Sequence, residues 1–166
     1  FSLEFMLGER LSGKTVLIVG AGRIGRETAR LVEAFGAVPV FAGRDADLDA
    51  LLPEADVVSL HVPLTAETRH LIDARRLGLM KPGACLINVA RAEIVDEAAL
   101  YRALASGSIA GAALDVWYRY PTVVGSALPS TQPFHELGNV LMTPHVSGWT
   151  DGMIEARATL IADNIQ

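Results

Sequence analysis

The sequence has a single cysteine, a deficit of positive charge and no long hydrophobic run. Cys85 has no second cysteine with which to form an internal disulfide and lies in an apolar, strand-like segment, which favours a reducing, cytoplasmic setting. Because no run of about 18 apolar residues occurs, the sequence predicts no membrane-spanning helix. The first residues lack the basic-then-apolar pattern of a secretion signal. The chain starts at Phe1 without a methionine, and we expect it to be a fragment of a longer chain.

The charge balance argues against a nucleic-acid partner. Lys and Arg number 14 against 19 Asp and Glu, the formal net charge is −5, and the basic residues form no stripe. A hydrophobic content of 51% excludes a disordered chain, and 166 residues are enough for one domain with a full core. We therefore expect a folded domain that acts on a small molecule, and we predict no metal site.

The segment 20–25, G-A-G-R-I-G, is the most informative feature. It follows the apolar stretch 15–19 and precedes apolar residues at helical spacing over 24–35. In a dinucleotide site Gly20 allows the tight turn, Gly22 lets the backbone approach the phosphates, and Gly25 lets the helix pack on the strand. A G-x-G-x-x-G alone is a weak signal, but a strand before it and a helix after it are the required context. The segment predicts a site for a dinucleotide pyrophosphate.

Strand-like and helix-like segments alternate along the whole chain. Strands are predicted over 15–19, 38–41, 56–60, 84–89, 110–114 and 140–142, and helices over 24–35, 47–52, 67–72, 74–79, 97–105 and 152–165. The stretch 117–138 lacks a clear period and is expected to be a loop. This order predicts an α/β fold of the Rossmann type, with a doubly wound parallel sheet and helices on both faces. Ligands of such sheets bind beyond the carboxyl ends of the strands.

The end of the second strand bears on the choice of coenzyme. NAD enzymes usually place an acidic side chain there for the ribose 2′-hydroxyl, whereas an arginine suits the 2′-phosphate of NADP. Here Gly43 and Arg44 follow the strand, so NADP is favoured. If the turn instead brings Asp45 to that place, NAD is preferred, and NAD stays possible.

Polar residues follow the other strands, where one crevice is expected. His61 and Thr68 follow the third strand, Arg91 the fourth, Asp115 the fifth and His145 the last. Each alone has an ordinary structural explanation, but together, beside a dinucleotide motif, they suggest a reaction site. Arg91 would hold a substrate carboxylate through two hydrogen bonds, and His145 would exchange the hydroxyl proton. The coenzyme would carry the hydride.

Several segments, in this order, resemble the nucleotide-binding domain of the D-isomer-specific 2-hydroxyacid dehydrogenases. They are G-A-G-R-I-G at 20–25, H-V-P-L-T-A-E-T-R at 61–69, K-P-G-A-C-L-I-N-V-A-R-A-E-I-V-D-E-A-A-L at 81–100, G-A-A-L-D-V-W at 111–117 and T-P-H-V-S-G at 143–148. The resemblance runs from residue 11 to the end. It is specific for the family and much less so for the substrate, and glyoxylate, hydroxypyruvate and longer 2-ketoacids all remain open.

The resemblance implies an NAD(P)-dependent oxidoreductase that interconverts small D-2-hydroxyacids and 2-ketoacids. Arg91 matches the carboxylate-binding arginine, His145 the acid/base, and Asp115 an acid near the nicotinamide. It also implies a homodimer and a separate substrate domain, so that 13–149 would be the dinucleotide domain, with 1–12 and 150–166 leading to the missing part. The residues expected to bind the coenzyme are Gly20, Gly22, Arg23, Ile24, Gly25, Arg44, His61, Val62, Pro63, Thr68, Val89, Ala90, Arg91, Asp115, His145 and Gly148.

Two positions depart from the family's usual pattern. Ala92 follows Arg91 where glycine is usual, which is a small change. Tyr120 precedes Pro121 where a glutamate commonly pairs with the catalytic histidine. A phenol offers no negative charge to an imidazolium, so we expect His145 to be a weaker base than with a carboxylate partner. Glu136, in the expected loop, is an alternative partner.

Two other functions stay open, the first of them because of Tyr120. Formate dehydrogenases of the same superfamily carry a neutral glutamine at this position and transfer hydride without a proton relay. A non-catalytic, nucleotide-sensing module is a further alternative, because fold alone does not establish catalysis. A pure sensor would have no need of Arg91 and His145 together.

Overall fold

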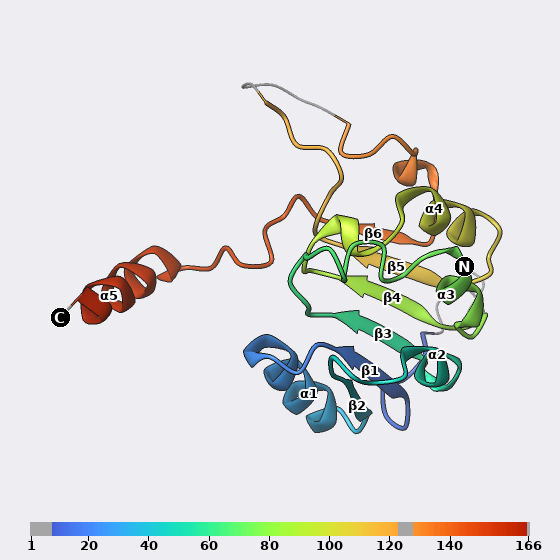
Figure 1. The fold of residues 1–166 in the computed structure, drawn as a ribbon, viewed down its shortest axis with the longest axis horizontal. Helices are drawn as coiled ribbons and strands as arrows, with labels where there is room; N and C mark the ends of the chain where they lie inside the picture. The colour runs from blue at the N-terminus through green and yellow to red at the C-terminus, as the bar shows by residue number, and fades with distance from the viewer. Residues whose placement is uncertain (1–7, 123–127, 166) are drawn as a thin grey trace.

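The computed structural model describes residues 8–122 and 128–165, and its centre is a six-stranded, fully parallel sheet (Figure 1). The strands lie in the order β2-β1-β3-β4-β5-β6. Their bounds are β1 Thr15–Val19, β2 Val38–Ala42, β3 Val57–Leu60, β4 Cys85–Asn88, β5 Gly111–Leu114 and β6 Val140–Met142. The chain runs outward from β1 to β2 and then returns to the other side of β1 as β3. The strand order therefore reverses between β1 and β3, where such sheets bind their ligands.

Side chains of β1 alternate between the two faces of the sheet, as the two-residue period of a strand requires. Leu17 and Val19 join the large core cluster, whereas Val16 and Ile18 join a smaller one with Ala29 of α1 (Arg23–Ala34). The large cluster includes residues of α2 (Leu48–Leu51), α3 (Ala74–Leu79) and α4 (Glu97–Ala105). Helices thus cover both faces, and the predicted α/β fold with a doubly wound sheet is confirmed.

The short helices begin at aspartates that cap them. Asp47, Asp73 and Asp96 each accept hydrogen bonds from amides of the first turn of α2, α3 and α4, respectively. Such a side chain satisfies amides that have no partner within the helix. The longer α1 starts differently, because Gly22 precedes it and provides no side-chain cap. Its first amides stay available for a ligand.

One predicted helix is wrong. Residues 66–70 form turns rather than part of a helix over 67–72. The hydroxyl of Thr68 accepts a hydrogen bond from the Thr65 amide and donates one to the Pro63 carbonyl, and His70 has a left-handed φ of 53°. Hydroxyl groups that bind nearby main chain compete with helix formation. Ile72 then forms an isolated parallel bridge with Val95.

The long predicted loop contains a short 3₁₀ helix, η4 (Phe134–Glu136), which the sequence pattern did not predict. Two further 3₁₀ turns, η2 (Leu52–Glu54) and η3 (Ala92–Ile94), extend the connections after α2 and β4. Phe134 anchors η4, because its ring is buried against the rings of Tyr101 and Trp117.

The predicted C-terminal helix is present as α5 (Met153–Ile165), which stands apart from the sheet (Figure 1). Among the residues described, no helix combines the length and apolarity needed to cross a bilayer.

Candidate active site at the carboxyl edge of the sheet

The turn between β1 and α1 leaves no room for side chains at two of its glycines. Gly20 has a φ of +108°, and a Cβ built on it would lie 2.7 Å from the carbonyl oxygen of His61. A Cβ on Gly25 would lie 2.1 Å from the carbonyl oxygen of Gly20. Both distances are far below van der Waals contact. A Cβ on Gly22, by contrast, would meet nothing within 4 Å, so this backbone faces open space.

Beside this turn lies a cleft of about 390 Å³. It is lined by Ile24, His61, Val62, Pro63, Leu64, Val89, Ala90 and Arg91. The uncapped amides that begin α1, the absence of acidic side chains from its first turn and the bare backbone at Gly22 suit a pyrophosphate. The residues therefore fit a dinucleotide coenzyme, which would lie across the β1–β3 edge.

His61 anchors the start of the loop that follows β3. Its amide donates to the Val19 carbonyl, and its Nε2 lies 2.9 Å from the hydroxyl of Ser59, which is buried. Burial lowers the pKa of His61, so the ring is neutral at pH 7. With the Thr68 hydroxyl closing the 63–68 turn, these contacts fix the loop that follows β3.

Arg91 stands on a loop that a buried asparagine holds in shape. Asn88, at the end of β4, donates from Nδ2 to the Arg91 carbonyl at 2.9 Å and accepts from the Ala90 amide at 3.1 Å. The guanidinium of Arg91 is exposed and donates to the Ala90 carbonyl at 2.6 Å. It lines the cleft and keeps further N–H groups for a ligand. Sequence inspection missed Asn88, although its place just before the Val89–Arg91 stretch was a signal.

Asp115 lies under the loop that carries His145. Its side chain is 3% exposed, and it accepts hydrogen bonds from the Thr143 hydroxyl at 2.6 Å and from the amides of Val146 and Ser147 at 2.9 and 3.0 Å. Burial alone would raise the pKa of Asp115, but the hydrogen bonds from Ser147, Thr143 and Val146 outweigh it and hold that pKa far below its ordinary value. Asp115 is therefore ionised, and its hydrogen bonds hold the 143–147 loop in place.

His145 is held from two directions. Its backbone φ of +59° is rare for a residue with a side chain. The hydrogen bonds that the amides of Val146 and Ser147 donate to Asp115 maintain this conformation. Its Nδ1 lies 2.8 Å from the hydroxyl of Tyr120, which also lies 3.1 Å from the amide nitrogen of Trp117. The Trp117 indole donates to the Thr143 carbonyl and so ties the two loops together. Glu136, the alternative partner, lies instead beside His135, with 3.9 Å between its carboxylate and Nε2.

Arg44 lies in the turn after β2, with an exposed side chain. The pKa of Glu67 is lowered mainly by hydrogen bonds from Thr65 and from its own amide, and the charge of Arg44 adds to this. Asp45 belongs to the same exposed turn.

The structure thus gathers most predicted site residues at one edge but not in one cavity. Ile24, His61, Val62, Pro63, Val89, Ala90 and Arg91 line the cleft. Gly20, Gly22, Arg23 and Gly25 form the adjoining turn, Thr68 and Arg44 belong to neighbouring loops, and Asp115, His145 and Gly148 belong to the β5–β6 side.

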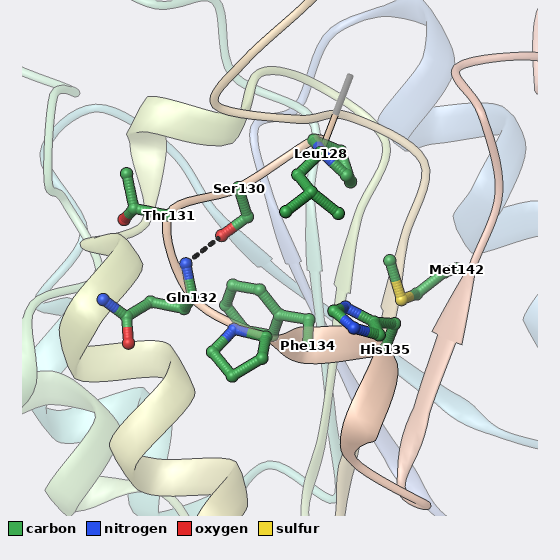
Figure 2. Close-up of a pocket in the computed structure, with 9 residues that line it drawn as sticks. Leu128, Ser130, Thr131, Gln132, Phe134, His135 and Met142 are labelled. Carbon is green, nitrogen blue, oxygen red and sulfur yellow. Dashed lines mark hydrogen bonds between the residues drawn. The ribbon is translucent and has the colours of Figure 1, made fainter. Parts of the chain in front are cut away.

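A second hollow, of about 80 Å³, contains none of the predicted site residues (Figure 2). It lies around Phe134 and Met142, and within 8–122 and 128–165 no cluster of metal-ligating side chains occurs.

The fold and this edge define a dinucleotide-binding domain, and comparison with known proteins specifies the family. Residues 2–147 match the model of the D-isomer specific 2-hydroxyacid dehydrogenase, NAD binding domain. The chain belongs to this family, as its motifs predict.

Individual relatives agree. The chain is 41% identical to a glyoxylate reductase of Thermofilum pendens, with 97% of this chain and 50% of that protein covered. Its structure resembles the NAD-complexed D-isomer specific 2-hydroxyacid dehydrogenase of Lactobacillus delbrueckii ssp. bulgaricus, at a TM-score of 0.84, 32% identity and coverage of 97% and 55%. It also resembles an acyclic imino acid reductase in complex with NADPH and D-Arg, at a TM-score of 0.85, 30% identity and coverage of 96% and 52%. The chain spans about half the length of the curated relatives it matches.

Proposed function

We propose that this chain provides the coenzyme site and two reacting side chains of an NAD(P)-dependent D-2-hydroxyacid dehydrogenase, working as a 2-ketoacid reductase. The observation that carries the proposal is the sheet edge at which the glycine turn, the cleft with Arg91 and the anchored His145 occur together. Relatives named glyoxylate reductase make a small 2-ketoacid such as glyoxylate the first candidate substrate.

The bound nicotinamide would supply or take up the hydride. Arg91 would bind the substrate carboxylate with its free N–H groups and so orient the carbonyl carbon. His145 would donate a proton from Nε2 to the carbonyl oxygen during reduction and recover it during oxidation. Asp115 and Asn88 would contribute indirectly, because they fix the loops from which His145 and Arg91 project.

We further propose that NADP is the preferred coenzyme. The support is the exposed residue Arg44, which follows Gly43 after the end of β2, because an arginine near this strand end can accommodate a 2′-phosphate in such folds. Related structures hold NADPH in one case and NAD in another, so both coenzymes belong in every assay.

The test is turnover of a panel of small 2-ketoacids by the full-length protein that contains this chain, with NADPH and with NADH. The His145→Ala variant should reduce kcat by about 10²–10⁴-fold and leave coenzyme affinity nearly unchanged. His135→Ala, which removes an exposed imidazole beside Glu136, is the matched control and should stay active. Unchanged turnover in His145→Ala would reject the proposed chemistry. Coenzyme binding without turnover of any panel member would favour the nucleotide-sensing alternative.

A further inference from the structure

The hydroxyl of Tyr120 sits between two nitrogen atoms that constrain its proton. The Trp117 amide can only donate, so it donates to the phenol oxygen across 3.1 Å. On the other side, 2.8 Å away, lies Nδ1 of His145, which accepts in one neutral tautomer and donates in the other. With the Trp117 amide donating to the oxygen, a Tyr120 O–H that donates to Nδ1 gives both the phenol proton and the unprotonated ring nitrogen a partner within the protein.

We propose that Tyr120 is a positioning residue that holds neutral His145 in the Nε2–H tautomer and supplies it with a proton during reduction. This inference rests on the proposed function for its catalytic part. A neutral imidazole with the proton on Nε2 already presents a donor to a substrate carbonyl. A carboxylate in place of the phenol would only accept hydrogen bonds and would select the opposite tautomer, with the proton on Nδ1.

The proton transfer balances as follows. As a hydride from a reduced nicotinamide coenzyme would add to the carbonyl carbon, the Nε2–H bond would break and an O–H bond would form on the substrate. At the same time the Tyr120 O–H bond breaks and an Nδ1–H bond forms, so the imidazole ends neutral. The phenolate that remains accepts the Trp117 N–H and regains a proton from water. In the oxidation direction every bond change is reversed.

Neither Asp115 nor Arg119 replaces Tyr120 as the hydrogen-bond partner of the His145 imidazole. The buried carboxylate of Asp115 accepts hydrogen bonds from the amides of Val146 and Ser147 and not from the imidazole of His145. Arg119, next to Tyr120 in the chain, is exposed, and its amide donates to the Pro129 carbonyl. Within the described residues, Tyr120 is the side chain hydrogen-bonded to the His145 ring.

The first experiment needs neither coenzyme nor substrate. Nitrogen NMR of ¹⁵N-histidine-labelled full chain separates the tautomers, since protonated and unprotonated ring nitrogens have distinct shifts. His145→Gln identifies the signal among those of the chain's 4 histidines. In the wild type the spectrum should show the ring proton on Nε2. In Tyr120→Glu the proton should be on Nδ1, and Tyr120→Phe should show a mixture of the two tautomers. Tyr101→Phe, which removes a phenol hydroxyl on α4, should match the wild type.

The second experiment is the pH profile of 2-ketoacid reduction. In the proposed transfer the imidazole starts and ends neutral, so reduction does not depend on an imidazolium ion and extends to higher pH. Above neutral pH, Tyr120→Phe should lose about 10-fold or more in kcat, with KM within about 3-fold of the wild type. Tyr101→Phe should keep the wild-type profile.

Two results would overturn the inference: a wild-type ring with the proton on Nδ1, or identical ring shifts in the wild type and Tyr120→Phe. Identical kcat profiles for these two proteins would reject the proton supply. A chain with the expected tautomer but no turnover would refute the proposed function alone, and turnover with the wrong tautomer would refute this inference alone.

Discussion

Replacing Asp115 by asparagine tests whether this buried carboxylate holds the His145 loop. The asparagine oxygen can still accept from the Thr143 hydroxyl and the Val146 amide, but its NH₂ group would face the Ser147 amide, which is also a donor. Loss of one hydrogen bond to a charged group costs about 1.5–3 kcal/mol, and conversion of the other two to neutral bonds adds roughly 1 kcal/mol. We expect the free energy of unfolding to fall by about 3 kcal/mol at pH 7.

The pH dependence of this loss provides a second check. Because folding lowers the pKa of Asp115, its stabilising contribution is fully present above the unfolded pKa of about 3.9. It is lost as the pH falls through the folded pKa. The stability difference between wild type and Asp115→Asn should therefore stay constant from about pH 7 to 5 and shrink below about pH 4.

Urea unfolding of both proteins across this pH range measures the difference. Asp151→Asn, at an exposed aspartate in the segment before α5, is the control and should change stability by less than about 0.5 kcal/mol. A loss below about 0.5 kcal/mol at pH 7 for Asp115→Asn, or one that persists undiminished at the lowest pH where both proteins fold, would refute this reasoning.

Two further predictions concern the coenzyme site. Gly25→Ala should destabilise the fold by about 3 kcal/mol or more in urea unfolding, because its Cβ would lie 2.1 Å from the Gly20 carbonyl oxygen. Gly22→Ala should keep stability within about 1 kcal/mol, yet weaken coenzyme binding in calorimetry; equal stability of the two variants would contradict the packing argument. Arg44→Ala should raise the Kd for NADPH by about 10–100-fold and leave that for NADH unchanged, with Arg30→Ala on α1 as the control. Parallel loss of both affinities would contradict a 2′-phosphate contact.

The sequence was sufficient to predict a parallel α/β sheet and the positions of its strands along the chain. Strong apolar runs such as 15–19, and the glycines of the turn after them, act locally and leave a clear pattern. The 67–72 segment was wrongly predicted as a helix because its sequence gave no sign that the hydroxyls of Thr65 and Thr68 would bind nearby main chain. Turn chemistry of this kind depends on side-chain orientation and leaves no periodic signal.

The contacts around His145 were only partly predictable. The sequence singled out Tyr120 as unusual but could not establish that its hydroxyl meets Nδ1, because the two residues lie on different loops. The roles of Asn88 and Trp117 as loop anchors likewise depend on partners that only the folded chain brings within reach. The order of the strands, by contrast, follows from the alternation of strands and helices only once the family is known.

The most direct measurement is a crystal structure of the full chain with NADPH and an unreactive 2-ketoacid analogue. The account predicts the pyrophosphate on the amides that begin α1, the Arg91 guanidinium on the analogue's carboxylate, and Nε2 of His145 within hydrogen-bonding distance of the carbonyl oxygen. A complex in which the coenzyme lies elsewhere, or in which Arg91 and His145 both face away from the analogue, would contradict it.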